Sequence, residues 1–185
     1  MRIIAGRYRG RPLAPVGKGD SAAHLRPTSD RVRESLFNIL QSAGVVDDAR
    51  VLDLFAGTGA LGFEALSRGA QHVTFVDSGR VAQQLILRNA KTLGCESSIM
   101  LLRQDAGKLR EVDMPPFDLV FLDPPYGKSL GEAALETLAK GGWLASDAFV
   151  VWEENTPMTP PPGFALHDRR AYGGTYVTMM WLDGG

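Results

Sequence analysis

The stretch that decides the fold runs from Val51 to Gly62 and reads Val-Leu-Asp-Leu-Phe-Ala-Gly-Thr-Gly-Ala-Leu-Gly. Its first residues predict a short buried strand, and its glycines predict a tight turn into a helix that begins near Ala60. Glycine lets the backbone approach a ligand closely, and a helix N-terminus offers unpaired N–H groups to polar ligand atoms. We therefore predict a ligand-binding loop. Its candidate contacts are Phe55, Ala56, Gly57, Thr58 and Gly59.

Asp53 narrows the choice of ligand for this loop. A carboxylate inside an apolar strand is unfavourable unless it has a partner. Gly57–Gly62 also fits the spacing of the dinucleotide fingerprint, which is a weak signal by itself. A turn that merely requires small residues is the structural alternative. Asp53 would repel a pyrophosphate, so it favours a cationic or amino-bearing ligand and is itself a candidate contact.

The composition is that of one globular domain. The chain has 185 residues, of which 44% are hydrophobic and 22% charged. No apolar run approaches the ~20 residues of a membrane span, and no secretory signal is visible, so we expect a cytoplasmic location. We also expect a monomer. The single cysteine, Cys95, excludes an internal disulfide and is interpreted as a packed or surface thiol. The three histidines lack ligand spacing, so no metal is expected; they are His24, His72 and His167.

The charge is distributed unevenly along the chain. Residues 1–33 hold eight basic and two acidic side chains, a net charge of +6, which leaves −7 for the remainder because the whole chain carries −1. A basic terminus interleaved with glycine predicts an anionic partner such as a nucleic acid, and a solvated basic segment is the alternative. We predict a basic RNA-facing hairpin and loop at 1–28, followed by the main domain at 29–185. The candidate RNA contacts are Arg7, Arg9, Arg11 and Arg26.

Strands and helices alternate along most of the chain. Strands are predicted at 51–55, 72–77, 98–103, 118–122, 148–153, 164–168 and 175–182, and helices at 31–41, 60–68, 80–93 and 130–140. Ser29 or Asp30 is expected to cap the first helix. The last two strands lack an intervening helix and predict an antiparallel hairpin around Gly173-Gly174. The fold class is therefore α/β, with a doubly wound, mostly parallel seven-stranded sheet, an antiparallel C-terminal strand, and a small N-terminal β-hairpin between Arg2 and Pro15.

Two further acidic residues follow predicted strands, at the sheet edge where ligands of such folds bind. Asp77 ends the second strand of the series and is positioned to accept hydrogen bonds from both hydroxyls of a ribose. Ser78 follows it where a helix begins, and a simple helix cap is the alternative to the ribose role. Asp105 and Ala106 follow the next strand and are candidates for contact with an adenine amino group.

Asp123-Pro124-Pro125-Tyr126-Gly127 directly follows a strand that is almost entirely apolar. The prolines fix φ and remove two backbone donors, which leaves carbonyl oxygens as the available backbone groups. Asp123 adds an acceptor and Tyr126 adds a flat ring. This set suits a planar group that bears an amine, with N–H bonds to Asp123 and the Pro124 carbonyl and stacking on Tyr126. We therefore predict the reaction centre here.

These motifs resemble those of the S-adenosylmethionine-dependent methyltransferases that modify exocyclic amines of nucleobases. The N-terminal half extends the resemblance, through Gly6–Arg11, Arg26–Thr28, Asp30–Glu34 and Leu36–Asn38. Together they look like the bacterial family that methylates the guanine 2-amino group at one site in 16S ribosomal RNA. The resemblance covers essentially the whole chain. It implies that Asp53 through Gly59 hold the methionine end of the cofactor, while Asp77 holds its ribose.

The same resemblance places the adenine of the cofactor at Asp105-Ala106 and the target base at Asp123–Tyr126. Several alternatives stay open: an amino-methyltransferase for adenine in DNA or for a protein glutamine, a nicotinamide oxidoreductase, and a non-catalytic RNA-binding assembly factor. Whether naked RNA or an assembling small ribosomal subunit is the substrate also stays open. So do the roles of Arg26, Thr28 and Arg33, which could face the cofactor or the RNA.

Overall fold

A computed structural model describes residues 1–15, 29–109 and 114–184. The candidate RNA contact Arg26, together with Thr28, lies outside the described residues. In chain order the elements are α1 (Asp30–Ser42), β1 (Arg50–Leu54), α2 (Ala60–Ser67), β2 (His72–Val76), α3 (Arg80–Leu93), the 3₁₀ turn η1 (Glu96–Ser98), β3 (Ile99–Leu102), the 3₁₀ turn η2 (Ala106–Lys108), β4 (Phe117–Leu122), α4 (Leu130–Lys140), β5 (Leu144–Glu154), β6 (Phe164–Tyr172) and β7 (Thr175–Leu182).

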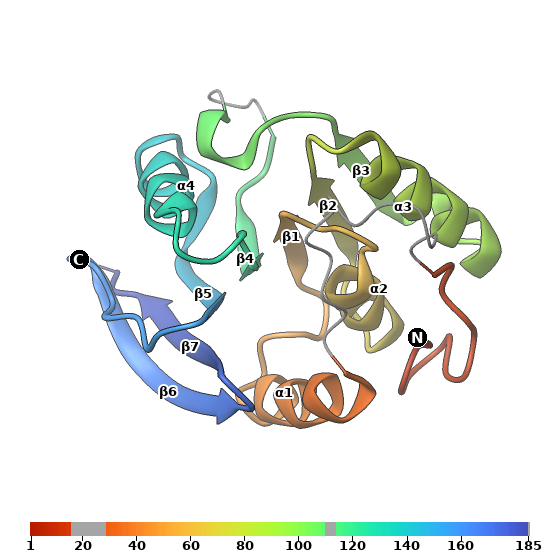
Figure 1. The fold of residues 1–185 in the computed structure, drawn as a ribbon, viewed down its shortest axis with the longest axis horizontal. Helices are drawn as coiled ribbons and strands as arrows, with labels where there is room; N and C mark the ends of the chain where they lie inside the picture. The colour runs from red at the N-terminus through yellow and green to blue at the C-terminus, as the bar shows by residue number, and fades with distance from the viewer. Residues whose placement is uncertain (16–28, 110–113, 185) are drawn as a thin grey trace.

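A seven-stranded sheet in the order β3-β2-β1-β4-β5-β7-β6 forms the centre of the molecule (Figure 1). The first five strands pair in parallel, and β7 pairs antiparallel with both β5 and β6. This confirms the predicted sheet, including its C-terminal hairpin. The chain first builds outward from β1 to β3 and then crosses to β4 on the other side of β1. The carboxyl ends of β1 and β4 therefore flank a topological switch point, where ligands of such sheets bind.

Helices cover both faces of the sheet, as expected for a doubly wound fold. Alternation along β1 directs Val51 to the face covered by α1, α2 and α3, and Leu52 to the face covered by α4. Both side chains are fully buried. Ser29 caps α1 by accepting a hydrogen bond from the Val32 N–H at 3.3 Å, as predicted. Within the described part of the chain, no helix has both the length and the apolar character needed to cross a membrane.

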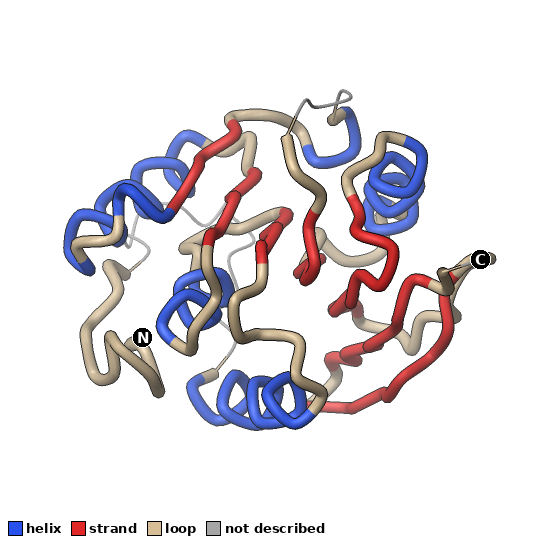
Figure 2. The backbone as a smooth tube through the Cα atoms, turned by 180° about the vertical axis from the view of Figure 1, so that it is seen from behind, coloured by secondary structure: helices blue, strands red, loops and turns tan. Residues whose placement is uncertain are grey.

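The predicted N-terminal hairpin is present in a short form. Its two arms share one antiparallel bridge, between Arg2 and Pro12, and backbone hydrogen bonds from the Ile3 N–H to the Arg11 carbonyl at 3.0 Å and from the Leu13 N–H to the Met1 carbonyl at 3.1 Å. The segment packs against α2 and the end of α3 (Figures 1 and 2). Helix α2 adds further bonds to this segment, because the side chain of Glu64 accepts the N–H groups of Ile4 and Ala5 at 2.8 and 3.1 Å. Sequence periodicity could not show this long-range pairing.

Strands β5 and β6 are longer than predicted. β5 begins at Leu144 because Leu144 already pairs with Phe117 at the start of β4. β6 pairs with β7 as far as Tyr172, through exposed polar residues of an edge strand that lack an apolar alternation. The register shifts between Leu166 and Asp168, so His167 is an extra residue in a bulge.

Candidate functional site

The glycine loop follows β1 as predicted and turns sharply into α2. Phe55 directly follows the strand with φ at +57°, a left-handed conformation that is unfavourable for an aromatic residue, and Gly59 caps the helix with φ at +75°. A Cβ at Gly59 would lie 2.7 Å from the ring of Phe63. The second glycine is therefore required by backbone conformation and by packing. Gly57 and Thr58 are buried within the turn, whereas Phe55 and Ala56 are half-buried.

Asp53 is buried beneath this loop, with 2% of its surface exposed. One of its carboxylate oxygens accepts the backbone N–H of Gly62 at 3.0 Å, which satisfies a donor in the first turn of α2. Sequence reasoning missed this capping bond. Burial raises the pKa of Asp53 to about 8, the Gly62 bond lowers it, and the nearby negative charge of Asp77 raises it further. Asp53 would therefore gain from a cationic partner.

Asp77 lies just beyond β2 and holds the surrounding backbone in place. Its two carboxylate oxygens accept the N–H groups of Gly57 at 2.9 Å and Gly79 at 2.7 Å. Gly79 is the N-cap residue of α3, so the Asp77 carboxylate bonds the start of that helix, as the helix-cap alternative expects; Ser78 is exposed beside it. Asp77 thus connects the glycine loop to the start of α3, which fixes both sides of a potential ribose site.

Asp105 and Ala106 follow β3, as expected. The Asp105 carboxylate accepts the N–H of Gly107 at 2.9 Å and caps the 3₁₀ turn η2. Ala106 is buried in the core on the α4 face. Asp105 is therefore exposed at the sheet edge, whereas the methyl group of Ala106 is buried.

The segment Asp123–Tyr126 follows β4 directly. The Tyr126 hydroxyl donates a hydrogen bond to Glu153 at 2.9 Å and lies 3.2 Å from the hydroxyl oxygen of Thr175. Sequence reasoning did not select Glu153, although it sits near the end of an apolar strand in the manner of Asp53. Burial raises the pKa of Asp123 well above its ordinary value, and the negative charges of Glu153 and Asp53 raise it further. Burial likewise raises the pKa of Tyr126, in that case beyond the normal range of a phenol.

The candidate residues thus form an acidic edge of the sheet. Asp105, Asp77, Asp53 and Asp123 lie at or near the carboxyl ends of β3, β2, β1 and β4, which are consecutive strands in the sheet. Carboxylates accept hydrogen bonds and attract cations, and they repel phosphates. The set therefore fits a ligand that carries positive charge, hydroxyl groups and amines along its length. It fits a dinucleotide with a pyrophosphate poorly.

Buried polar side chains attach the N-terminal segment to this edge. Asn89 of α3 is fully buried; it accepts the N–H of Ala14 at 2.7 Å and donates to the carbonyl of Thr58 in the glycine loop at 3.0 Å. Arg33 is also fully buried and donates to Asp30 and to the Arg2 carbonyl, each at 2.7 Å. Its role is therefore structural in this conformation. These long-range contacts left no local signal in the sequence.

The candidate RNA contacts Arg7, Arg9 and Arg11 differ in what their side chains contact. Arg11 donates to the carbonyls of Thr92 and Leu93, which caps the C-terminal end of α3. Arg7 lies over the ring of Tyr8, with its guanidinium carbon 5.4 Å from the ring centre. All three arginines are exposed. The structure therefore gives Arg11 a structural task that its two neighbours lack.

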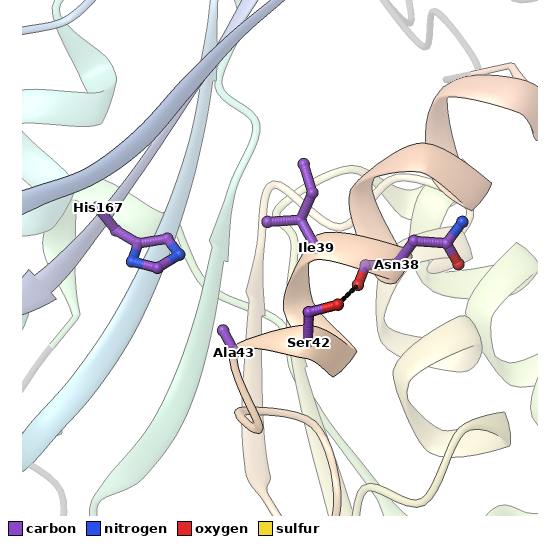
Figure 3. A pocket seen from close by; sticks show the side chains of 5 residues that line it. All are labelled: Asn38, Ile39, Ser42, Ala43 and His167. Atoms are coloured by element: carbon purple, nitrogen blue, oxygen red, sulfur yellow. Dashed lines mark hydrogen bonds between the residues drawn. The ribbon is translucent and has the colours of Figure 1, made fainter.

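Two cavities lie away from the acidic edge. One of about 370 Å³ separates α1 from β6, where Asn38, Ser42 and His167 border it (Figure 3). A second of about 670 Å³ lies between α4 and the proline-rich loop after β5. None of the candidate residues lines either cavity.

Within 1–15, 29–109 and 114–184, no group of three or more potential ligands is placed to hold a metal ion. Cys95 is a buried thiol, which confirms the interpretation as a packed thiol over that as a surface thiol.

The strand order, the glycine loop at the switch point and the helices on both faces define a class I methyltransferase. Residues 1–181 match the family described as Conserved hypothetical protein 95, and the chain belongs to that family. It is similar to ribosomal RNA small subunit methyltransferase D of Escherichia coli strain K12, with 40% identity over 176 residues that cover 94% of this chain and 85% of that protein.

Two further relatives support the family assignment. The protein of the same name from Haemophilus influenzae is 39% identical over 184 residues, which cover 94% of this chain and 89% of that protein. The solved structure of yhhF from Escherichia coli superposes with a TM-score of 0.86 at 37% identity, over 100% of this chain and 99% of that one. The similarity therefore extends through the N-terminal segment as well as the methyltransferase core.

Proposed function

We propose that this protein transfers a methyl group from S-adenosylmethionine to the 2-amino group of a specific guanine in 16S ribosomal RNA. The observation that carries the proposal is Asp123–Tyr126 at the switch point, next to an acidic edge that suits a cationic cofactor. The relatives named for ribosomal RNA small subunit methylation support the choice of substrate. The working enzyme is expected to be a cytoplasmic monomer.

The cofactor would lie along the acidic edge. Asp53 and the loop from Phe55 to Gly59 would hold its amino-acid end, where a cation relieves the buried carboxylate. Asp77 and Ser78 would accept the ribose hydroxyls, and Asp105 with Ala106 would contact the adenine. The cofactor supplies a methyl group on a sulfonium centre, which is already electrophilic, so the chain need only bind, orient and accept a proton.

The chain's own groups account for the remaining chemistry. The lone pair of an aromatic amine is delocalised into the ring, so the nitrogen is a poor nucleophile. Hydrogen bonds from its two N–H groups to Asp123 and the Pro124 carbonyl would favour a pyramidal nitrogen that points toward the methyl group. The new C–N bond leaves an excess proton on nitrogen, and Asp123, whose raised pKa suits a proton acceptor, would take it. Tyr126 would replace part of the base stacking lost when the guanine enters.

The function is tested by incubating the protein with labelled S-adenosylmethionine and separate pools of unmodified small-subunit rRNA, assembled small subunits, DNA and protein. Label at the guanine 2-amino group in either rRNA-containing pool supports the proposal. Label on DNA adenine or protein glutamine would replace it with the corresponding amino-methyltransferase. Cofactor binding without transfer to any pool would support an assembly factor.

Asp77→Ala should weaken S-adenosylmethionine binding by about 1–3 kcal/mol, the range for hydrogen bonds that involve a charged group. The loss has two sources, because Asp77 would contact the ribose and also orients Gly57. Titration calorimetry measures the affinity. Asp77→Asn is the matched variant, since it keeps one acceptor oxygen and should retain part of the affinity. Unchanged binding in the alanine variant would remove Asp77 from the cofactor site.

Replacing Arg7 and Arg9 together by alanine should reduce RNA affinity and flatten its salt dependence by about one to two units, because each phosphate contact releases condensed counterions. Arg11 is left in place because it caps α3. RNA binding across a salt series gives the slope. S-adenosylmethionine affinity should not change.

Lys140→Ala is the control for charge alone, since Lys140 is exposed on α4 and paired with Glu136. Its salt slope should equal that of the wild type. Equal slopes for the double arginine variant would make the N-terminal segment a solvated basic surface and would place the RNA elsewhere.

A further inference from the structure

Glu153 lies beside the proposed reaction centre and takes no part in the mechanism above. Leu122 of β4 pairs with Trp152 of β5, so the next residues along the two parallel strands, Asp123 and Glu153, are neighbours. Alternation places both on the face of the sheet that contains Phe121 and Val151. The two carboxylates therefore face the same space at the carboxyl edge of the sheet.

The Glu153 carboxylate is held in place by a specific contact. One of its oxygens accepts the Tyr126 hydroxyl at 2.9 Å, and the same hydroxyl lies 3.2 Å from Thr175 of β7. The Tyr126 hydroxyl therefore uses its one proton in the bond to Glu153. The second carboxylate oxygen of Glu153 has no hydrogen-bond partner among the described residues. Beside the ring of Tyr126, the chain therefore presents acceptors: the Asp123 carboxylate, the Pro124 carbonyl and the second oxygen of Glu153.

Only one standard base matches an edge of three acceptors. Guanine presents a ring N1–H next to its 2-amino group, which makes three adjacent N–H donors. Adenine and cytosine present an amine next to an unprotonated ring nitrogen. That nitrogen is itself an acceptor, so it would face the carboxylate oxygen of Glu153 with no hydrogen between them. If Asp123 and Pro124 bind the two amine hydrogens, as the proposed function holds, the N1–H is the donor that remains.

We propose that Glu153 is a specificity-determining residue that accepts the N1–H of the target guanine and so excludes bases that lack it. The inference rests on the proposed function. Electrostatics supports it, because burial raises the pKa of Glu153 and the charge of Glu153 raises that of Asp123. A base with three donors gives a hydrogen bond to both carboxylates, Asp123 and Glu153. A base with an acceptor in place of the N1–H gives a hydrogen bond to Asp123 only.

The test keeps the reacting amine and removes the N1–H. Small-subunit rRNA substrates are prepared with guanine or 2-aminopurine at the methylated position, once that position has been mapped. The wild type should prefer guanine by at least about tenfold in kcat/KM, the discrimination expected for one specific hydrogen bond to a base. In Glu153→Gln the guanine value should fall by about ten- to a hundredfold. The 2-aminopurine value should hold or rise, because an amide can donate to N1.

Two matched variants separate this role from simple support of Tyr126. Tyr126→Phe removes the hydroxyl but leaves Glu153, so it should preserve the preference for guanine whatever its overall rate. Glu154→Gln changes the neighbouring carboxylate, which accepts the Asn155 N–H, and should also preserve that preference. S-adenosylmethionine affinity close to that of the wild type shows that each variant is folded.

The outcomes distinguish this inference from the proposed function. If the wild type methylates no guanine in rRNA, the proposed function fails and this inference fails with it. If the wild type methylates guanine but Glu153→Gln keeps the same preference over 2-aminopurine, only the inference is overturned. The same holds if Tyr126→Phe loses the preference to the same extent, because Glu153 would then act only through the tyrosine.

Discussion

Asp123→Ala should lower kcat by about two orders of magnitude or more, the loss expected when a contact to the transition state is removed. S-adenosylmethionine affinity should stay nearly unchanged, because the proposed partner of Asp123 is the target amine and not the cofactor. Single-turnover kinetics on small-subunit rRNA, together with titration calorimetry for the cofactor, measures the two quantities. Wild-type turnover in this variant would remove the Asp-Pro-Pro-Tyr segment from the mechanism.

The pH dependence of the same step provides a second measurement. Only the ionised form of Asp123 can accept both a hydrogen bond and the departing proton. Since burial and neighbouring charges raise its pKa well above the ordinary value, the rate should rise with pH through a midpoint above the normal range for a carboxyl group. Asp123→Asn keeps one acceptor oxygen and cannot titrate, so its residual activity should lose that rise.

The local elements of the fold could be predicted from the sequence because their signals are local. Helices α3 and α4 were predicted with the bounds that the structure has, since each combines apolar periodicity with glycine at or near its ends. β7 also has its predicted bounds, fixed by the glycine pair before it and a run of apolar and β-branched residues. The short edge strand β3 shifted by a residue at each end, which is the ordinary uncertainty of strand boundaries.

The positions of the site residues could be predicted in part. Any carboxylate that follows a parallel strand must lie at the carboxyl edge of the sheet, so chain order alone brings Asp53, Asp77, Asp105 and Asp123 together. Their present contacts depend on partners far away in the sequence. The Gly62 bond of Asp53 and the Gly57 bond of Asp77 arise only when the glycine loop closes over the strand ends.

The contacts missed by sequence reasoning share a physical cause. Glu64 and Asn89 are polar residues on helices, where they would ordinarily face solvent, yet both are fully buried against the N-terminal segment. Each satisfies backbone N–H groups of that segment that its own two arms do not bond to each other. A helical polar residue has the same local pattern whether it meets water or a chain terminus, so tertiary structure alone identifies these two.

Binding of S-adenosylmethionine at pH 7 should release close to one proton, because the ligand-free Asp53 has a pKa of about 8 and is mainly protonated at that pH. An ammonium or sulfonium group beside the carboxylate favours its ionised form and lowers the pKa, so the proton departs on binding. Titration calorimetry in two buffers with different ionisation enthalpies gives the number of protons released. Asp53→Asn should abolish most of the release and weaken binding by about 1.5–3 kcal/mol.

The same variant should have the opposite effect on the ligand-free protein. A carboxyl group whose pKa is raised by folding stabilises the fold at low pH and loses that contribution as the pH rises from about 4 toward 8, since the unfolded chain ionises first. Asp53→Asn cannot ionise and still accepts the Gly62 N–H, so its free energy of unfolding should exceed that of the wild type at pH 8, by an amount on the order of 3–5 kcal/mol. At pH 4 the two should be nearly equal. Denaturant unfolding at the two pH values measures this crossover, and a wild type that is the more stable at pH 8 would contradict a buried, uncompensated carboxylate beneath the glycine loop.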